Sequence, residues 1–279
     1  MRKRKLLRSF LVNMAICIFL LINFSPLIIA LSSSFRPMNY EGSPLEVFKI
    51  FSLESYQKAY RKMGYFTALG NSVLLTSISV AAIVAFASMA AYPMARVRTR
   101  TSRFFSNFFL AGLIVPGQLS LIPIYIILSK LMILKVSYAA PMIMFVTCSL
   151  PFSTFLYTGF IRGSVPYELE EAALLDGVGL FRMFWQIVFP LLIPATVAVI
   201  ITQSVWIWND FFMPMLFIGK KVNKPLPLVM LSFMGDRENP TQWNVLFAAC
   251  YLCALPLLLA FSIMQKYFLS GLTLGAVKG

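Results

Sequence analysis

Apolar residues in this sequence come in long continuous blocks, without the short alternating patterns of half-buried strands. A bilayer core of about 30 Å needs about 20 apolar residues in a helix. Six blocks reach that length: Phe10–Leu31, Gly70–Met94, Phe104–Leu128, Tyr138–Ile161, Ile187–Trp208 and Val245–Met264. A membrane β-barrel would need alternating segments of about ten residues. The pattern therefore predicts an all-α, polytopic membrane protein with six transmembrane helices.

Basic residues next to the spans predict the orientation of the chain. Residues 2–5 are all Arg or Lys and precede the first span, and several arginines lie in 96–103 between the second and third spans. Such clusters stay in the cytoplasm, although summed over all loops the bias is slight. A cleaved signal peptide is an alternative, but the first apolar block is longer than a signal core. We expect a multi-pass inner-membrane protein with both termini cytoplasmic.

The spans divide the chain into three regions. Residues 1–69 form an anchor helix and an external loop, partly helical around Leu53–Arg61. Residues 70–265 form a core of five spans that includes a cytoplasmic loop at 162–186, and 266–279 form a cytoplasmic tail. The external segment Asn209–Asn244 is rich in Lys and Pro and is predicted to be a turn-rich surface loop.

Composition agrees with a membrane location and narrows the function. The chain is 59% hydrophobic and 12% charged, with a mean hydropathy of +0.80, whereas soluble chains are about 45–50% apolar and about 25% charged. Its net charge of +14 would suggest nucleic acid on a soluble protein. Here the basic residues flank apolar blocks, where they set topology and attract anionic headgroups. No nucleic-acid partner is expected.

Cysteine and histidine offer no sign of a metal site. The chain has no His, and its four cysteines, Cys17, Cys148, Cys250 and Cys253, all lie in apolar segments. The last two form a C-x-x-C pair without the second pair or His that a zinc site needs. We expect free cysteines that behave as small hydrophobes.

The loop after the fourth span carries four of the ten acidic residues of the chain, all within Glu168–Asp176. Ser164 and Pro166 are helix-start signals, carboxylates suit the positive end of a helix, and Gly177 or Gly179 can end it. A short acidic helix is predicted, with Ala172 and Ala173 forming a face without bulk that another protein can approach. The alternative, a helix lying on the membrane surface, would usually be basic.

The same loop resembles the EAA loop of ABC-importer permeases. The matching positions are Glu171, Ala172, Ala173, Gly177, Ile187 and Pro190, with Phe189 where Leu is usual. Trp208–Phe211 and the C-terminal Gly271–Gly279 are similar to the carbohydrate-uptake branch, especially the maltose-type second permease subunit. The similarity covers residues 10–279 and is strongest from Pro166 onward.

This resemblance implies a type I ABC-importer permease fold and a sugar substrate. It also implies a second homologous permease subunit, two cytoplasmic ATPase subunits that bind ATP and Mg, and an external solute-binding protein. The implied ATPase-docking residues are Glu171, Ala172, Ala173, Asp176 and Gly177. A secondary ATPase contact is implied for Gly275, Lys278 and Gly279 in the tail.

Residues that the chain lacks also limit its function. It has no G-x-x-x-x-G-K-[ST] phosphate loop, so we expect no cofactor in this chain. No charged residue lies deep within an expected span, which disfavours an ion-coupled carrier, and no acid, base or nucleophile set supports an enzyme. An ABC permease for another solute and an ion-coupled carrier are the alternatives to a sugar permease.

A sugar pathway needs hydrogen-bonding and aromatic side chains, and the fifth span offers several. The candidates are Gln203, Trp206, Trp208 and Asn209. Trp near a span end is also an ordinary interface anchor. By resemblance, the second permease subunit can hold most of the sugar contacts.

Overall fold

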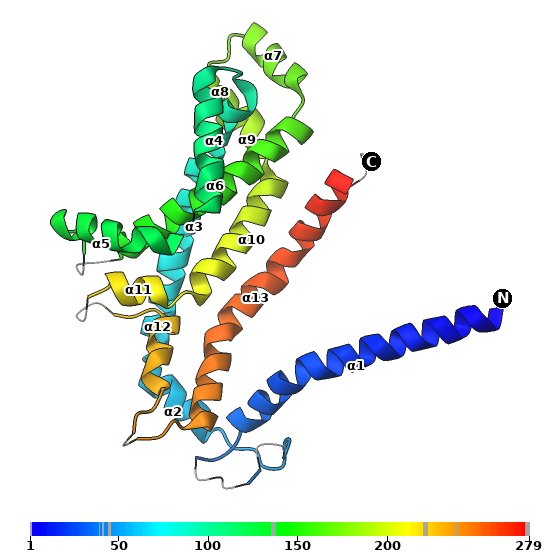
Figure 1. Ribbon diagram of the computed structural model, residues 1–279, viewed down its shortest axis with the longest axis vertical. Helices are drawn as coiled ribbons and strands as arrows, with labels where there is room; N and C mark the ends of the chain where they lie inside the picture. Colours follow the sequence, from blue (N-terminus) through cyan, green and yellow to red (C-terminus); the bar gives the residue numbers. More distant parts are fainter. Residues whose placement is uncertain are drawn as a thin grey trace. The chain divides into compact units, whose positions relative to one another are not determined.

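The computed structural model of the chain describes residues 2–38, 40, 42–43, 46–115, 117–134, 138–219, 223–237 and 239–276, with side chains except in 2–8, 118 and 265–276. Every regular element in these ranges is helical (Figure 1), as expected for segments that must satisfy their own backbone groups in lipid. The all-α class predicted from the sequence is confirmed.

In chain order the elements are α1 (Arg2–Ser34), α2 (Glu54–Met63), α3 (Tyr65–Arg96), α4 (Arg100–Ile114), the 3₁₀ helix η1 (Gly117–Ser120), α5 (Leu121–Lys130), α6 (Ala139–Ser164), α7 (Tyr167–Leu175), α8 (Leu180–Met183), the π-helical η2 (Phe184–Val188), α9 (Phe189–Leu191), α10 (Ile193–Asn209), α11 (Phe212–Phe217), α12 (Leu226–Met230), the 3₁₀ helix η3 (Leu231–Phe233) and α13 (Trp243–Ala276). They belong to two compact units. Unit 1 comprises Met1–Phe66 and Val229–Leu255, and unit 2 comprises Thr67–Leu228 and Pro256–Gly279.

Unit 1 contains α1, α2 and the beginning of α13. The helix expected around Leu53–Arg61 is confirmed as α2. Hydrogen bonds between distant segments hold this unit: Tyr251 donates to the Leu27 carbonyl at 2.6 Å, and the Asn244 amide donates to the Pro37 carbonyl at 3.0 Å. None of the most apolar stretch of α1 is buried, so its surface suits contact with lipid.

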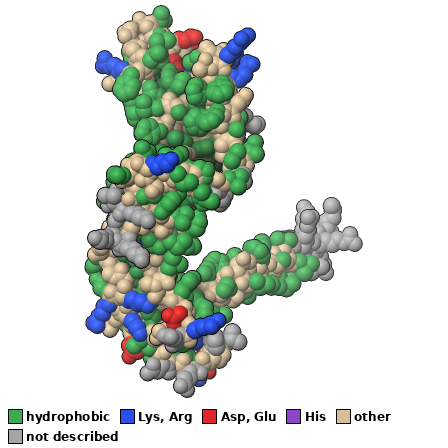
Figure 2. Space-filling view, turned by 60° about the vertical axis from the view of Figure 1, so that its left-hand side comes forward, with side chains coloured by type: hydrophobic (Ala, Val, Ile, Leu, Met, Phe, Trp, Pro, Cys, Tyr) green, Lys and Arg blue, Asp and Glu red, His purple; other side chains and the backbone are tan. Residues whose placement is uncertain are grey.

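Four described helices are long and apolar enough to cross a membrane. They are Ser9–Ser34, Tyr65–Arg96, Ala139–Ser164 and Trp243–Met264, and they coincide with the first, second, fourth and sixth expected spans. In Figure 2, hydrophobic side chains cover most of the visible flank of unit 2, while charged side chains gather at its end near α7. This distribution is typical of a bundle surrounded by lipid.

The third expected span, 104–128, is not one helix. Helix α4 ends at Ile114, and η1 and α5 follow as separate pieces. Val115 is extended, with φ −74° and ψ 122°, which is the conformation that a residue before proline favours. The Pro116-Gly117 pair in the sequence therefore interrupts an apolar block that hydropathy alone treats as continuous.

The fifth expected span, 187–208, is also interrupted. Leu180–Leu191 and Ile193–Asn209 pass together as one apolar span but are bent by 75° at Leu192. Pro190 and Pro194 lie on either side of this residue, and proline removes a helix hydrogen bond and crowds the preceding turn. Helix α10 therefore begins at Ile193, six residues later than predicted.

The core of unit 2 joins α3, α6 and α10. Its fully buried side chains include Ile83, Phe145, Tyr157 and Val199. The Tyr157 hydroxyl donates to Thr196 Oγ1 at 2.9 Å, which ties α6 to α10. Such interhelical bonds contribute about 0.6 kcal/mol each in membrane bundles, so most of the cohesion comes from packing.

The segment Asn209–Asn244 contains more structure than the predicted turn-rich loop. Two short helices, α11 and α12, lie within it. The Asp210 carboxylate accepts a 2.8 Å hydrogen bond from the Met213 N–H and so stabilises the first turn of α11. The composition of this segment does not predict these helices, because both are short and each contains a proline.

Candidate functional site at the acidic helix α7

Helix α7 forms where the acidic cluster predicted a short helix. It begins at Tyr167, directly after Pro166, whose φ of −65° and ψ of 139° are extended. Glu168 and Glu170 lie in its first turn, where carboxylates are stabilised by the positive end of the helix dipole. The predicted short acidic helix is therefore confirmed.

Gly177 ends α7 in the way predicted for one of the two candidate glycines. Its φ is +76°, a left-handed conformation that is cheap only for glycine. The Gly177 N–H donates to the Leu174 carbonyl at 3.0 Å, and the Val178 N–H donates to the Ala173 carbonyl at 3.0 Å. These two bonds form a Schellman motif, which fixes the direction in which the chain leaves α7.

Glu170 anchors α7 to the end of α3. Its side chain and that of Arg96 are each only 7% exposed, and Arg96 Nη2 lies 2.6 Å from Glu170 Oε1. Arg96 Nε donates to the same oxygen at 2.7 Å, and the Tyr92 hydroxyl donates to Glu170 Oε2 at 2.8 Å. The buried carboxylate is thus fully paired, as a buried charge must be.

The contacts of Arg96 extend beyond this ion pair. Arg96 Nη2 donates to the Val165 carbonyl at 2.7 Å, just before α7 begins. The Tyr167 ring covers the guanidinium at 4.2 Å, and the Tyr167 hydroxyl donates to the Arg96 carbonyl at 3.3 Å. Together Tyr92, Arg96, Tyr167 and Glu170 form what we call the α3–α7 clamp. These contacts join α7 to the end of α3.

Sequence reasoning missed the clamp, although Glu170 directly precedes the EAA motif. Arg96 is 74 residues from Glu170 in the sequence. The sequence pattern around Arg96 indicates only that it contributes to the cytoplasmic charge bias. A pairing across that distance cannot be found from spacing within one sequence.

The predicted docking residues lie on α7, but not all on one face. Glu171, Ala172, Asp176 and Gly177 are exposed, whereas Ala173 is 5% exposed and packs inward. Consecutive helix residues are about 100° apart, so the expected single bare face of Ala172 and Ala173 is wrong. Leu175, which had not been singled out, is 90% exposed.

Aromatic side chains continue the connection from α7 toward α10. The ring of Phe184 lies 5.5 Å from that of Tyr92 and 5.1 Å from that of Trp185, and the Trp185 ring lies 5.0 Å from that of Phe189. Such ring pairs add about 0.5–1.5 kcal/mol beyond their buried area. The segment after Gly177 is therefore packed against α3 before the chain bends into α10.

An apolar groove of about 610 Å³ lies beside α7. Its lining includes Met89, Pro93, Val97, Leu174, Leu180 and Phe181. Leu180 and Phe181 are 66% and 69% exposed. Exposed apolar side chains next to exposed carboxylates are typical of a surface that another protein covers.

The predicted pathway residues occupy different environments on α10. Gln203 is buried and accepts a 2.7 Å hydrogen bond from the Ser149 hydroxyl, and Trp208 is 6% exposed. Trp206 is 40% exposed with an edge-on contact to Phe145, and the Asn209 amide donates to the Val205 carbonyl at 2.8 Å.

The predicted tail contact is described only in part. Residues up to Ala276 continue α13 as helix, which includes the backbone of Gly275. Lys278 and Gly279 lie outside the described residues.

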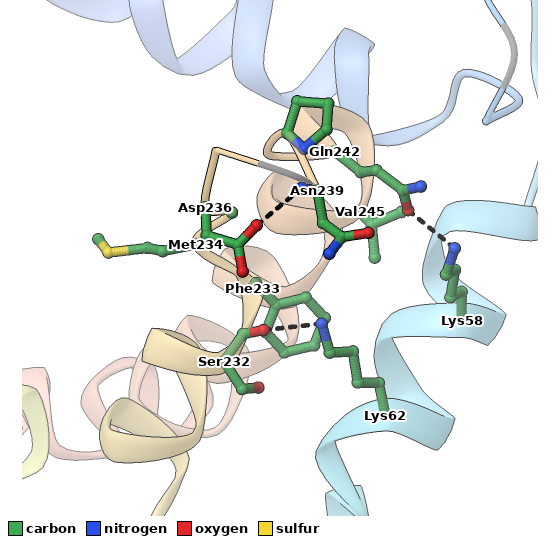
Figure 3. Close-up of a pocket in the computed structure, with 11 residues that line it drawn as sticks. Lys58, Lys62, Ser232, Phe233, Met234, Asp236, Asn239, Gln242 and Val245 are labelled. Atoms are coloured by element: carbon green, nitrogen blue, oxygen red, sulfur yellow. Dashed lines mark hydrogen bonds between the residues drawn. The ribbon is translucent and has the colours of Figure 1, made fainter.

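Unit 1 contains a polar pocket of about 330 Å³ beside α2 (Figure 3). Lys62 donates to the Ser232 carbonyl at 2.7 Å, and Lys58 donates to Gln242 Oε1 at 2.8 Å (dashed in Figure 3). The Lys62 ammonium also lies 4.7 Å from the centre of the Phe233 ring. These contacts fix the segment before α13 to α2.

Clusters that hold metal ions and disulfides do not occur among the described residues. No group of three or more Cys, Asp or Glu side chains there could hold a metal ion, and none of the four cysteines forms a disulfide. The carboxylates of α7 are instead used in the clamp or exposed.

Comparison with known families identifies the class of protein. Residues 83–273 match the family described as the binding-protein-dependent transport system inner membrane component. The chain belongs to this family, whose members are transporter permeases and not enzymes. It is accordingly a multi-pass component of an inner membrane, and permeases of this type work with a binding protein and ATPase subunits.

Individual relatives cover nearly all of the chain. It is 32% identical over 257 residues to the melibiose/raffinose/stachyose import permease protein MelC of Bacillus subtilis, covering 92% of each chain. It is 31% identical over 259 residues to the multiple sugar-binding transport system permease protein MsmG of Streptococcus mutans, covering 91% of each.

A solved structure has the same fold. A chain of a bacterial ABC transporter involved in the import of the acidic polysaccharide alginate superimposes with a TM-score of 0.79. The superposition covers 94% of this chain and 96% of that chain, at 19% sequence identity. The type I importer permease fold that the EAA resemblance implied is confirmed.

Proposed function

We propose that this chain is the permease subunit of an ABC importer that carries a mono- or oligosaccharide across the cytoplasmic membrane. Several relatives of similar length bear names of sugar transport systems. The chain has no phosphate-loop motif, which supports ATP hydrolysis on separate subunits. ATP and Mg belong to those subunits in this proposal.

The proposed assembly contains this chain, a second homologous permease, two ABC ATPases and an external solute-binding protein. Helix α7 docks on an ATPase through Glu171, Ala172, Asp176 and the Gly177 turn, and the tail makes a secondary contact. The exposed carboxylates and the exposed Leu175 support this assignment. Both termini lie in the cytoplasm, and α4, η1 and α5 together make the third of six crossings.

The α3–α7 clamp is the observation that carries the proposal. A docking helix transmits movement only if it is joined rigidly to a span. The buried Arg96–Glu170 pair joins α7 to α3, and the Schellman turn at Gly177 fixes the chain that leads to α10. Force applied to α7 by a closing ATPase is therefore passed to two spans.

The experiment is uptake and subunit co-purification with Glu171→Arg and with Gly177→Pro. Both variants should insert into the membrane yet lose ATPase association and transport, because one reverses a docking charge and the other cannot adopt a positive φ. Glu54→Arg reverses a charge on exposed α2 and serves as the control. Normal uptake in both α7 variants would overturn the docking assignment.

Sugar selection is tested separately, because it belongs to the assembled system. The solute-binding protein that co-purifies with the complex should bind a sugar when screened against mono- and oligosaccharides. Proteoliposomes of the complex should then take up that sugar only with ATP inside. Gradient-driven flux through this chain alone, without nucleotide, would favour the ion-coupled carrier instead.

A further inference from the structure

A basic pocket of about 670 Å³ lies in unit 2 where α3 ends and α4 begins. Arginines from three segments line it: Arg96 and Arg98 at and after the end of α3, Arg103 on α4 and Arg162 on α6. Thr99, Ser102, Ser106 and Asn107 add hydroxyl and amide groups, and no Asp or Glu is among its lining residues. The lining favours an anion with several acceptor oxygens.

Two of these arginines are already used within the chain. Arg96 is paired with Glu170, and Arg162 donates to the Met94 carbonyl at 2.8 Å. In the described part of the chain, Arg98 and Arg103 form no ion pair, and both are exposed. The pocket thus keeps an excess of positive charge that is available to a ligand.

An apolar crevice continues from the basic pocket between α4 and α6, which pack side by side. Phe109, Phe155 and Gly159 line it, and it shares Met94, Ser106, Leu110 and Arg162 with the pocket. Thr154 lines the crevice too; it is 1% exposed, and its Oγ1 has no hydrogen-bond partner among the described residues. The crevice wall at Thr154 is therefore tightly packed.

We propose that this pocket and crevice form a binding site for an anionic glycerophospholipid. The phosphate binds Arg98 and Arg103, and the beginning of an acyl chain fills the crevice. Basic pockets at the ends of membrane helices bind such headgroups, and α3 and α4 are both apolar helices that meet here. A soluble phosphate would use the arginines but not the crevice.

The position of the site gives the bound lipid a role in coupling, and this part rests on the proposed function. Arg96 and Tyr167 line the basic pocket and also belong to the α3–α7 clamp. A phosphate at Arg98 and Arg103 adds negative charge next to Arg96 and helps to hold its guanidinium in place. The occupied site therefore stabilises the clamp, and transport per ATP should rise with anionic lipid.

The test uses the purified importer complex, delipidated and then titrated with phosphatidylglycerol or phosphatidylcholine during native mass spectrometry. The wild-type complex should retain phosphatidylglycerol preferentially. Arg98→Gln with Arg103→Gln should weaken its retention by about 25-fold, since each basic residue near an anionic surface contributes about fivefold. Arg100→Gln, in the same turn but outside the pocket lining, is the matched control.

A second variant tests the crevice without touching the arginines. A Cβ at Gly159 meets no atom within 4 Å, so Gly159→Leu should fold and should block the acyl chain. Gly163 on the same helix is equally open but does not line the crevice, which makes Gly163→Leu its control. Gly159→Leu should lower phosphatidylglycerol retention, and Gly163→Leu should not.

Three results would overturn the lipid assignment. Competition by soluble glycerol phosphate, with Gly159→Leu silent, would indicate a free-phosphate site. Equal retention of both lipids by wild type, together with poor subunit recovery in the double arginine variant, would indicate a protein partner in the pocket. Lipid retention unchanged in both variants would remove the site, while leaving the docking role of α7 untouched.

Discussion

At the residue scale, Arg96 and Glu170 form a buried ion pair within unit 2. Both side chains are 7% exposed, and removing one partner of a buried pair costs about 3–5 kcal/mol because the other charge is left uncompensated. Replacing both partners by neutral groups is far less costly. Each of the two charges therefore stabilises the fold only while its partner is present, and the coupling between them can be measured.

We expect Arg96→Gln to lower the melting temperature of the complex and to uncouple ATP hydrolysis from transport. The double variant Arg96→Gln with Glu170→Gln should recover much of the stability, because two neutral side chains leave no buried charge. A double-mutant cycle on Tm and on transport per ATP measures the coupling. Additive effects of the two substitutions would contradict the clamp.

Gly177 gives a smaller and more local prediction. Gly177→Ala places a Cβ at a φ of +76° and should destabilise the end of α7 by about 1 kcal/mol. Gly179 has an ordinary φ of −67° and equally open space, so Gly179→Ala is a matched control that should be nearly silent. Proteolysis of the 175–180 segment and ATPase co-purification would report the difference.

At the element scale, helix α7 shows how far the sequence could be interpreted. Its start after Pro166, its acidic first turn and an end at Gly177 or Gly179 follow from local chemistry, whereas the choice of Gly177 comes from the structure. The inward position of Ala173 and the Glu170 anchor depend on which side of α7 meets α3. No local sequence pattern indicates which side of α7 that is.

The interrupted spans show a second limit of prediction from the sequence. Hydropathy treats 104–128 and 187–208 as continuous because Pro116, Gly117, Pro190 and Pro194 lie within apolar blocks. Proline is often tolerated in membrane helices, so its presence alone does not predict a break. Whether neighbours re-satisfy the freed backbone groups is decided by packing.

The exposed end of α7 supplies the element-scale prediction. Leu175 is 90% exposed, and burying a leucine side chain in an interface contributes about 1.5–3 kcal/mol. Leu175→Ser should therefore weaken ATPase binding by about tenfold to a hundredfold without changing the stability of this subunit. Leu53→Ser, at an exposed leucine of unit 1, is the control, and equal ATPase binding by both variants would contradict the interface.

At the scale of the whole molecule, the orientation of α7 decides the proposed function. Single cysteines at Ala172 and at Glu54, in a background without the four native cysteines, should react with an impermeant maleimide from opposite sides of the membrane. Ala172 is suited to this test because it is exposed, unlike its neighbour Ala173. Labelling of Ala172→Cys in intact cells would place α7 outside and refute ATPase docking.

The 75° bend at Leu192 divides the fifth expected span into two helical arms that meet at an angle. Its short arm, Leu180–Leu191, has twelve residues and is about 18 Å long at the helical rise of 1.5 Å per residue. A rotation of this arm by about 10° about the bend would move its far end by about 3 Å. A small displacement at the α7 end of this arm would therefore reach the bend at which α10 begins.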